Sequence, residues 1–174
     1  IAAYLAGFLR AANATVFPSR ELDKGAGNGT SGQPRWTEGA KYHAEAQGAP
    51  SWVYTDGSDE LTRDLHARPL WGNYLSADIF VSLHNNAASG TARGTVTFWE
   101  ERTSYGTTYA VPSKELAEYI HLRAINAVRA DYDQVWKDRS VEECVSHLGN
   151  TLAVLRMSAR PAALTEFCFF DNQT

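Results

Sequence analysis

The sequence predicts an α/β fold, with a single domain built on a mostly parallel central sheet that helices cover on both faces. Segments with helical periodicity alternate along the chain with short apolar segments typical of buried strands, which is the pattern of a parallel sheet. The length of 174 residues is that of one domain. Hydrophobic residues make up 44% and charged residues 21% of the chain, a composition that excludes wholesale disorder.

Three segments are expected to be helices. The first begins at the first residue, where apolar side chains recur at the helical period (Ile1, Leu5, Phe8, Leu9 and Ala12). The second covers residues 59–75, and Pro69 within it predicts a kink or two shorter helices, because proline lacks a backbone N–H. The third is expected to start at Ser113, a favourable N-cap residue. Its apolar stripe comprises Leu116, Ile120, Ala124, Ala127 and Val128.

Three segments are expected to be strands of the covered sheet. Residues 77–83 are apolar on both faces, as in a central strand, residues 94–99 alternate, and residues 162–168 are again largely apolar. Two shorter segments are less regular. Residues 14–17 predict a short strand, and residues 51–54 predict either a brief strand or an anchored loop.

Two polar stretches separate these elements. Residues 21–50 hold six of the thirteen glycines, so we expect either a mobile insertion or a functional loop at the rim of a site. Residues 131–150 are polar and are expected to be irregular. Residues 151–157 are apolar again.

Charge and cysteine content restrict the function classes. The net charge of −4 argues against a surface that neutralises nucleic-acid phosphates, so no nucleic-acid partner is expected. No run of about 18 apolar residues occurs, so no membrane span is expected either. Cys144 and Cys168 are expected to be small buried residues, and whether they pair is left open.

Two motif matches lack the context that their chemistry needs. Residues 27–32 match G-x-G-x-x-G, but a dinucleotide site requires a strand directly before the motif and a helix directly after it. Residues 43–45 match the H-x-E of zinc deaminases, whose paired C-x-x-C thiolates are missing here. Both segments are therefore interpreted as loops.

His84 is the histidine whose position predicts a function. It follows the strand expected at 77–83, and ligands of open α/β sheets bind outside the carboxyl ends of strands. A hydrogen-bonded structural histidine is the alternative. The other four histidines are expected in polar loops or on helix surfaces (His43, His66, His121 and His147).

Glu166 is the second candidate residue, because it lies within the apolar strand expected at 162–168. An unpaired buried carboxylate would cost several kcal/mol, so the side chain should face a partner, a metal or a cleft. The alternatives are a solvated edge and an ion pair with an arginine such as Arg160. A strand-end imidazole beside a strand-borne carboxylate is typical of hydrolytic zinc sites, where the metal activates water and the carboxylate accepts its proton.

Several segments together resemble the zinc-dependent N-acetylmuramoyl-L-alanine amidases of the amidase-3 type. Residues 82–87 are similar to the family's S-x-H-x-N-A motif, and residues 161–172 to its P-A-x-L-x-E-x-x-F-x-x-N motif. Weaker similarity occurs at residues 1–20, 68–73, 94–99, 138–141 and 152–156. The resemblance implies one catalytic domain over residues 1–174, incomplete at both ends and with an insertion at 21–58.

The resemblance also implies a chemistry and a substrate. His84 would be a Zn²⁺ ligand and Glu166 the catalytic carboxylate, with two further ligands, a His and a Glu, expected upstream of Ile1. Asn86 would contact substrate. The reaction would be hydrolysis of the amide between N-acetylmuramic acid and the L-alanine of the peptidoglycan stem peptide, in the periplasm or outside the cell. A polymeric substrate agrees with four tryptophans near the predicted rim, which ordinary packing also explains (Trp36, Trp52, Trp71 and Trp99).

Four features depart from the family pattern. Asn85 stands where a small residue is usual, Cys168 replaces a glycine, Pro69 lies inside an expected helix, and residues 21–58 are inserted. The insertion is expected either to cover the substrate groove or to be a passive loop. Two other functions stay open. One is a non-catalytic cell-wall-binding or assembly module with the amidase fold, and the other is an unrelated α/β hydrolase that uses His84 and Glu166 without zinc.

Overall fold

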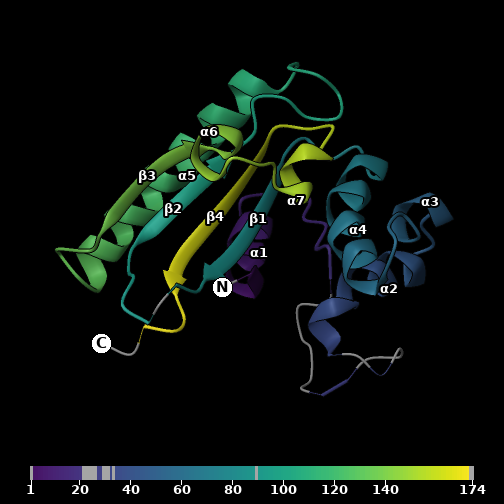
Figure 1. Cartoon of the computed structure of the whole chain (residues 1–174), viewed down its shortest axis with the longest axis horizontal. Helices are drawn as coiled ribbons and strands as arrows, with labels where there is room; N and C mark the ends of the chain where they lie inside the picture. The colour runs from purple at the N-terminus through teal and green to yellow at the C-terminus, as the bar shows by residue number, and fades with distance from the viewer. Residues whose placement is uncertain (1, 21–26, 29–31, 33, 89, 173–174) are drawn as a thin grey trace. The chain divides into compact units, whose positions relative to one another are not determined.

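The computed structural model describes residues 2–20, 27–28, 32, 34–88 and 90–172 (Figure 1). The chain forms two compact units, Ile1–Asp78 and Ile79–Thr174, and each is described by itself. None of the helices in the described ranges has the length and apolar character needed to cross a bilayer.

The described part of the first unit is helical. Its elements are α1 (Ala2–Ala11), a 3-10 turn η1 (Arg35–Thr37), α2 (Gly39–Ala46), α3 (Ser51–Tyr54) and α4 (Glu60–Tyr74). The helices expected at the chain start and at 59–75 are confirmed. Of the two alternatives expected at Pro69, two shorter helices are wrong, since α4 continues through it as one helix. Asp59 caps α4 by accepting a hydrogen bond from the backbone N–H of Thr62 at 2.9 Å.

Three expectations for the first unit are corrected. Residues 14–17 form no strand, and the N–H of Ala14 bonds back to the carbonyl of Leu9 at the end of α1. Residues 51–54 form the single helical turn α3. At its start, the Pro50 carbonyl accepts a hydrogen bond from the N–H of Val53. Within 21–50, residues 35–46 are ordered as η1 and α2 rather than as a loop.

A tertiary contact explains α2. The carboxylate of Asp64, on α4, accepts the backbone N–H groups of Ala40 and Lys41 in the first turn of α2. Those N–H groups have no partner inside the helix, so the buried carboxylate satisfies them. Its negative charge also interacts favourably with the positive end of the helix dipole. Arg68 completes the arrangement with an ion pair to Asp64 at 2.8 Å.

The second unit is a four-stranded sheet with three helices, and it confirms the α/β class. Its elements are β1 (Phe80–Asn86), β2 (Thr95–Trp99), α5 (Ala110–Asp131), β3 (Asp138–Glu143), α6 (Cys144–Leu148), α7 (Ala153–Arg156) and β4 (Ala162–Phe169). The strand order is β1-β4-β2-β3, with β4 lying between β1 and β2 in Figure 1. The sheet is mixed: β1 pairs parallel with β4 and β2 with β3, while β2 and β4 are antiparallel.

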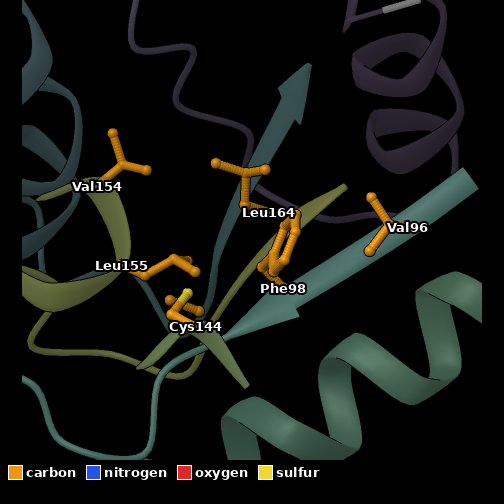
Figure 2. Close-up of a cluster of buried hydrophobic side chains, with 7 residues drawn as sticks. Val96, Phe98, Cys144, Val154, Leu155 and Leu164 are labelled. Carbon is orange, nitrogen blue, oxygen red and sulfur yellow. The ribbon is translucent and has the colours of Figure 1, made fainter. Parts of the chain in front are cut away.

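Helices cover both faces of this sheet. One face packs on α6 and α7 through a hydrophobic core (Val96, Phe98, Cys144, Val154, Leu155, Ala162 and Leu164). Figure 2 labels all of these residues except Ala162. The other face carries Thr97 and Thr165, paired across β2 and β4, and packs on α5. Alternation along β4 therefore places Leu164 and Glu166 on the face opposite α5.

Four expectations for the second unit are corrected. Helix α5 begins at Ala110, so Ser113 is not its N-cap; the Ser113 hydroxyl instead accepts the N–H of Ala162 at 3.0 Å and ties α5 to β4. The buried line of α5 is Ser113, Ala117, His121 and Ile125, displaced from the predicted stripe. The polar stretch 131–150 forms β3 and α6, because an edge strand is mostly exposed and needs no apolar face. Cys144 is buried as predicted, but Cys168 is partly exposed, and both are free.

Candidate functional site

His84 and Glu166 are brought together by the pairing of β1 with β4. Their Cα atoms are register partners in this parallel pair, so both side chains leave the sheet on the same face. Both residues are half-buried and lie near the carboxyl ends of their strands. This is the edge where open α/β sheets bind ligands.

Asn86 is the hydrogen-bond partner of Glu166. Its Nδ2 donates to Glu166 Oε2, whereas Arg160, the cation considered as a partner from the sequence, is not hydrogen-bonded to Glu166 in the described structure. Burial raises the pKa of the Glu166 carboxyl above its usual value, and the bond from Asn86 opposes this by favouring the charged form. The result is a partly desolvated carboxylate with a fixed orientation, which suits a proton acceptor.

Asn86 is itself held at three atoms. Besides its bond to Glu166, its Oδ1 accepts the backbone N–H of Ala87 at 2.7 Å. Its carbonyl accepts the N–H of Phe170, just after β4, at 2.9 Å. The two side-chain bonds restrict the rotation of the amide, and the carbonyl bond ties the backbone of Asn86 to the residue that follows β4.

The loop that follows Asn86 is clamped to the end of β4. This loop connects β1 to β2, which flank β4, and it meets the residues that follow β4. Asp171 Oδ2 accepts the N–H groups of Ala88 and Gly90 at 2.9 and 3.0 Å. Asn172 Nδ2 donates to the carbonyls of Thr91 and Ala92 at 3.2 and 3.0 Å. We call these contacts of Asp171 and Asn172 the loop clamp.

Sequence reasoning missed the contribution of Asp171 to the loop clamp. The bonds from Gly90 and Ala88 hold the pKa of the Asp171 carboxyl below its usual value, because they favour the charged form. The signal available in the sequence was a polar Asp-Asn pair directly after an apolar strand. It does not by itself identify the backbone groups that the pair binds.

Two departures from the family pattern contact each other. The thiol Sγ of Cys168 lies 3.3 Å from Asn85 Oδ1, as donor to acceptor. Asn85 is on β1 and Cys168 on β4, so the contact is a side-chain bridge between the two strands.

The described residues do not supply a complete metal site. No group of three or more His, Cys, Asp or Glu side chains able to hold a metal ion occurs among them. What they offer is the single imidazole of His84 beside the Glu166 carboxylate. This donor set fits one ligand and a neighbouring base, and the further ligands expected from the resemblance are not supplied by these residues.

His121 is buried, contrary to the expectation of a solvated histidine. Its Nδ1 lies 3.1 Å from Thr97 Oγ1 and its Nε2 lies 2.9 Å from Asp138 Oδ1. Thr97 Oγ1 in turn is 3.1 Å from Thr165 Oγ1. The network joins α5 to three strands, and since Thr97 and Thr165 are fully buried it is structural rather than open to substrate.

Glu100, which follows β2, is a second carboxylate that the sequence did not single out. Only 2% of it is exposed. Burial, reinforced by the nearby charge of Glu143, raises its pKa to about 7, while a bond from the Cys144 thiol and the charge of Arg156 oppose the shift. Glu100 lies beside the core rather than beside His84, so it affects stability more than chemistry.

The two discounted motifs belong to the first unit of the chain, whereas His84 and Glu166 belong to the second. Residues 29–31 of the G-x-G-x-x-G match lie outside the described residues. His43 lies in α2 rather than in a loop, with its ring edge-on to Trp71 at 6.3 Å.

The whole chain matches a family of known enzymes. The family model Amidase_3, described as N-acetylmuramoyl-L-alanine amidase, matches residues 1–174. An uncharacterized cell wall amidase of Bacillus anthracis is 36% identical over 126 residues, which are 65% of this chain. The match spans only 22% of that relative's length.

Solved structures show the same fold. The CwlD amidase of Clostridioides difficile, solved in complex with the GerS lipoprotein, is similar with a TM-score of 0.58 and 18% identity, over 97% of this chain and 66% of that one. Cwp6 from Clostridium difficile is similar with a TM-score of 0.51 and 25% identity, over 88% of this chain and 24% of that one.

Proposed function

Since the chain belongs to the Amidase_3 family of N-acetylmuramoyl-L-alanine amidases, we propose that it is the catalytic part of a peptidoglycan amidase. The bond cleaved is the amide between N-acetylmuramic acid and the L-alanine of the stem peptide. The observation that carries the proposal is the register pairing of His84 with Glu166 on one face of the sheet, with Asn86 bonded to the carboxylate. Family membership removes the alternative of an unrelated α/β hydrolase.

Glu166 is the base of the proposed reaction. Its carboxylate accepts a proton from the attacking water and returns it to the amine that leaves when the C–N bond breaks. A raised pKa suits this role, because it makes the carboxylate a stronger proton acceptor. Asn86 keeps the carboxylate oriented, and its proposed contact with substrate would add to this role.

His84 is proposed to hold Zn²⁺ as one of its ligands. Bound zinc polarises a carbonyl oxygen and lowers the pKa of its water toward about 7. Two further ligands, a His and a Glu, are proposed to complete the ligand set.

The proposed place of action is the cell wall, outside the cytoplasmic membrane. The name of the Bacillus anthracis relative supports this, as does the peptidoglycan substrate of the family. Peptidoglycan is the partner proposed, and no protein partner is assigned.

A non-catalytic cell-wall-binding or assembly module that keeps the amidase fold is the second candidate. Digestion of purified peptidoglycan separates the two candidates. Amidase activity releases stem peptides with free L-alanine amino groups, and a chelator should stop the release. A protein that binds the wall but releases no peptides would be the module. Release that is unaffected by chelator would contradict the zinc mechanism.

A further inference from the structure

Four aromatic rings form a row in the first unit. His43, on α2, contacts Trp71 edge-on at 6.3 Å between ring centroids. Trp71 stacks on Tyr74, one turn further along α4, at 5.8 Å and an interplanar angle of 29°. Tyr74 meets Trp52, on α3, edge-on at 6.2 Å and 78°. The row therefore joins α2 and α3, which lie within the predicted insertion 21–58, to α4.

Burial falls along this row from Trp71 to Trp52. Trp71 is only 7% exposed, whereas Tyr74 is 43% and Trp52 is 50% exposed. Trp52 and Tyr74 therefore form a contiguous pair of rings that keeps a large apolar area in contact with water. We propose that Trp52 and Tyr74 form a sugar-binding platform for an N-acetylated hexosamine ring of the glycan strand, a proposal that rests on the function proposed above.

The platform is held rigidly. Trp52 is carried by a helical turn that begins at Pro50 and whose Val53 is fully buried. Tyr74 is carried by the last turn of α4 and rests on the buried ring of Trp71. Aromatic side chains that are already fixed lose little conformational entropy on binding, so more of the contact energy appears as affinity.

The two exposed rings offer apolar surface to one face of a pyranose. They are nearly perpendicular, so they do not cover each other face to face. A hexosamine ring has a face of C–H groups, whose partial positive charge is attracted to the negative face of an aromatic ring.

The size and surroundings of the platform favour a saccharide over a protein. A stable protein interface buries about 800 Å² on each partner, which two aromatic side chains do not supply. The exposed residues nearest Trp52 along the chain are Ser51, Thr55 and Asp56, of which the first two are small and uncharged and the third is acidic. A polymer of hexosamines, the glycan of peptidoglycan, has hydroxyl groups that can donate to a carboxylate, so it suits such a rim better than an anionic ligand.

Direct binding measurements test the proposal. Calorimetric titration with a soluble N-acetylglucosamine tetramer and co-sedimentation with insoluble purified sacculi should both show binding. Trp52→Ala and Tyr74→Ala should each weaken it by about tenfold or more, since aromatic residues dominate such contacts. Trp52→Phe keeps an aromatic ring, so its affinity for the glycan should stay within about threefold of that of the unchanged protein. Tyr132→Ala, which removes an 81% exposed tyrosine of the other unit, is the matched control and should change nothing.

The outcomes separate this proposal from the enzymatic one. Failure of the unchanged protein to bind either glycan overturns the platform, as does equal loss in the Trp52→Ala and Trp52→Phe variants or in the Tyr132→Ala control. Unfolding temperatures of all variants show whether a loss reflects misfolding. Binding that depends on Trp52 without release of stem peptides would support the platform and overturn the amidase activity. Release of stem peptides together with unaltered glycan binding in the alanine variants would support the amidase activity and overturn the platform.

Discussion

His84 and Glu166 are opposite one another on parallel strands and share one face of the sheet, although 82 positions separate them in the chain. Pairing of β1 with β4 is what joins them, so the site forms only when the sheet does. The bond from Asn86 to Glu166 links the same two strands. Three polar side chains are thus positioned by backbone pairing rather than by a flexible loop.

Replacing Glu166 with glutamine should abolish turnover. The amide keeps the shape of the side chain but cannot accept the proton of water, and loss of a general base costs about 10²- to 10⁴-fold in rate. Release of stem peptides from purified peptidoglycan measures the effect. Glu118→Gln changes an exposed carboxylate on α5 and should leave the rate unchanged. Full activity of Glu166→Gln would remove the residue from the mechanism.

Replacing His84 with alanine should weaken zinc binding while the sheet stays intact. Loss of one proposed ligand is expected to lower the affinity by roughly 100-fold or more, a larger effect than loss of an outer-shell partner. Competition with a chromophoric chelator measures the affinity independently of activity, and circular dichroism reports the fold. His147→Ala, which removes a partly exposed histidine after β3, is the control. Equal zinc affinity in His84→Ala and the unchanged protein would show that His84 is not a ligand.

The covered strands could be predicted because in each of them the residues that indicate burial follow one another in the sequence. β1, β2 and β4 each contain an apolar segment bounded by turn residues, and that signal is local. β3 could not be predicted, because an edge strand is mostly exposed and its stability comes from pairing with β2. Helix α2 was missed for a related reason: its first turn is satisfied by Asp64, from a helix that begins fourteen residues after α2 ends.

The candidate site was predictable only in part. His84 and Glu166 stand out because each is a polar residue at or inside an apolar strand. Their register, the bond from Asn86 and the loop clamp depend on contacts between residues about 80 positions apart, and nothing in a local pattern specifies them. The same holds for His121, whose partners lie on β2 and β3.

Replacing Asp171 with alanine should release the loop that follows β1. The amides of Ala88 and Gly90 lose their acceptor, so their hydrogen exchange should accelerate by about tenfold or more. Because the clamp restrains the loop directly after Asn86, peptide release should also slow. Asp171→Asn keeps an acceptor oxygen and should restore most of the protection. Unchanged exchange at both amides in Asp171→Ala would show that the clamp does not hold the loop in solution.

Glu100 should make the protein less stable as the pH rises from about 4.5 to about 7. Its pKa of about 7 in the folded chain lies above the ordinary 4.5, so in this window the unfolded chain loses the proton while the folded chain keeps it. The free energy of unfolding should fall by up to about 1.4 kcal/mol per pH unit, roughly 2–3 kcal/mol in all. Glu100→Gln stays neutral in both states and should remove this fall, whereas the exposed neighbour Glu101→Gln should keep it. Urea unfolding at pH 5, 6 and 7.5 measures the difference, and parallel pH profiles for Glu100→Gln and the unchanged protein would contradict a raised pKa.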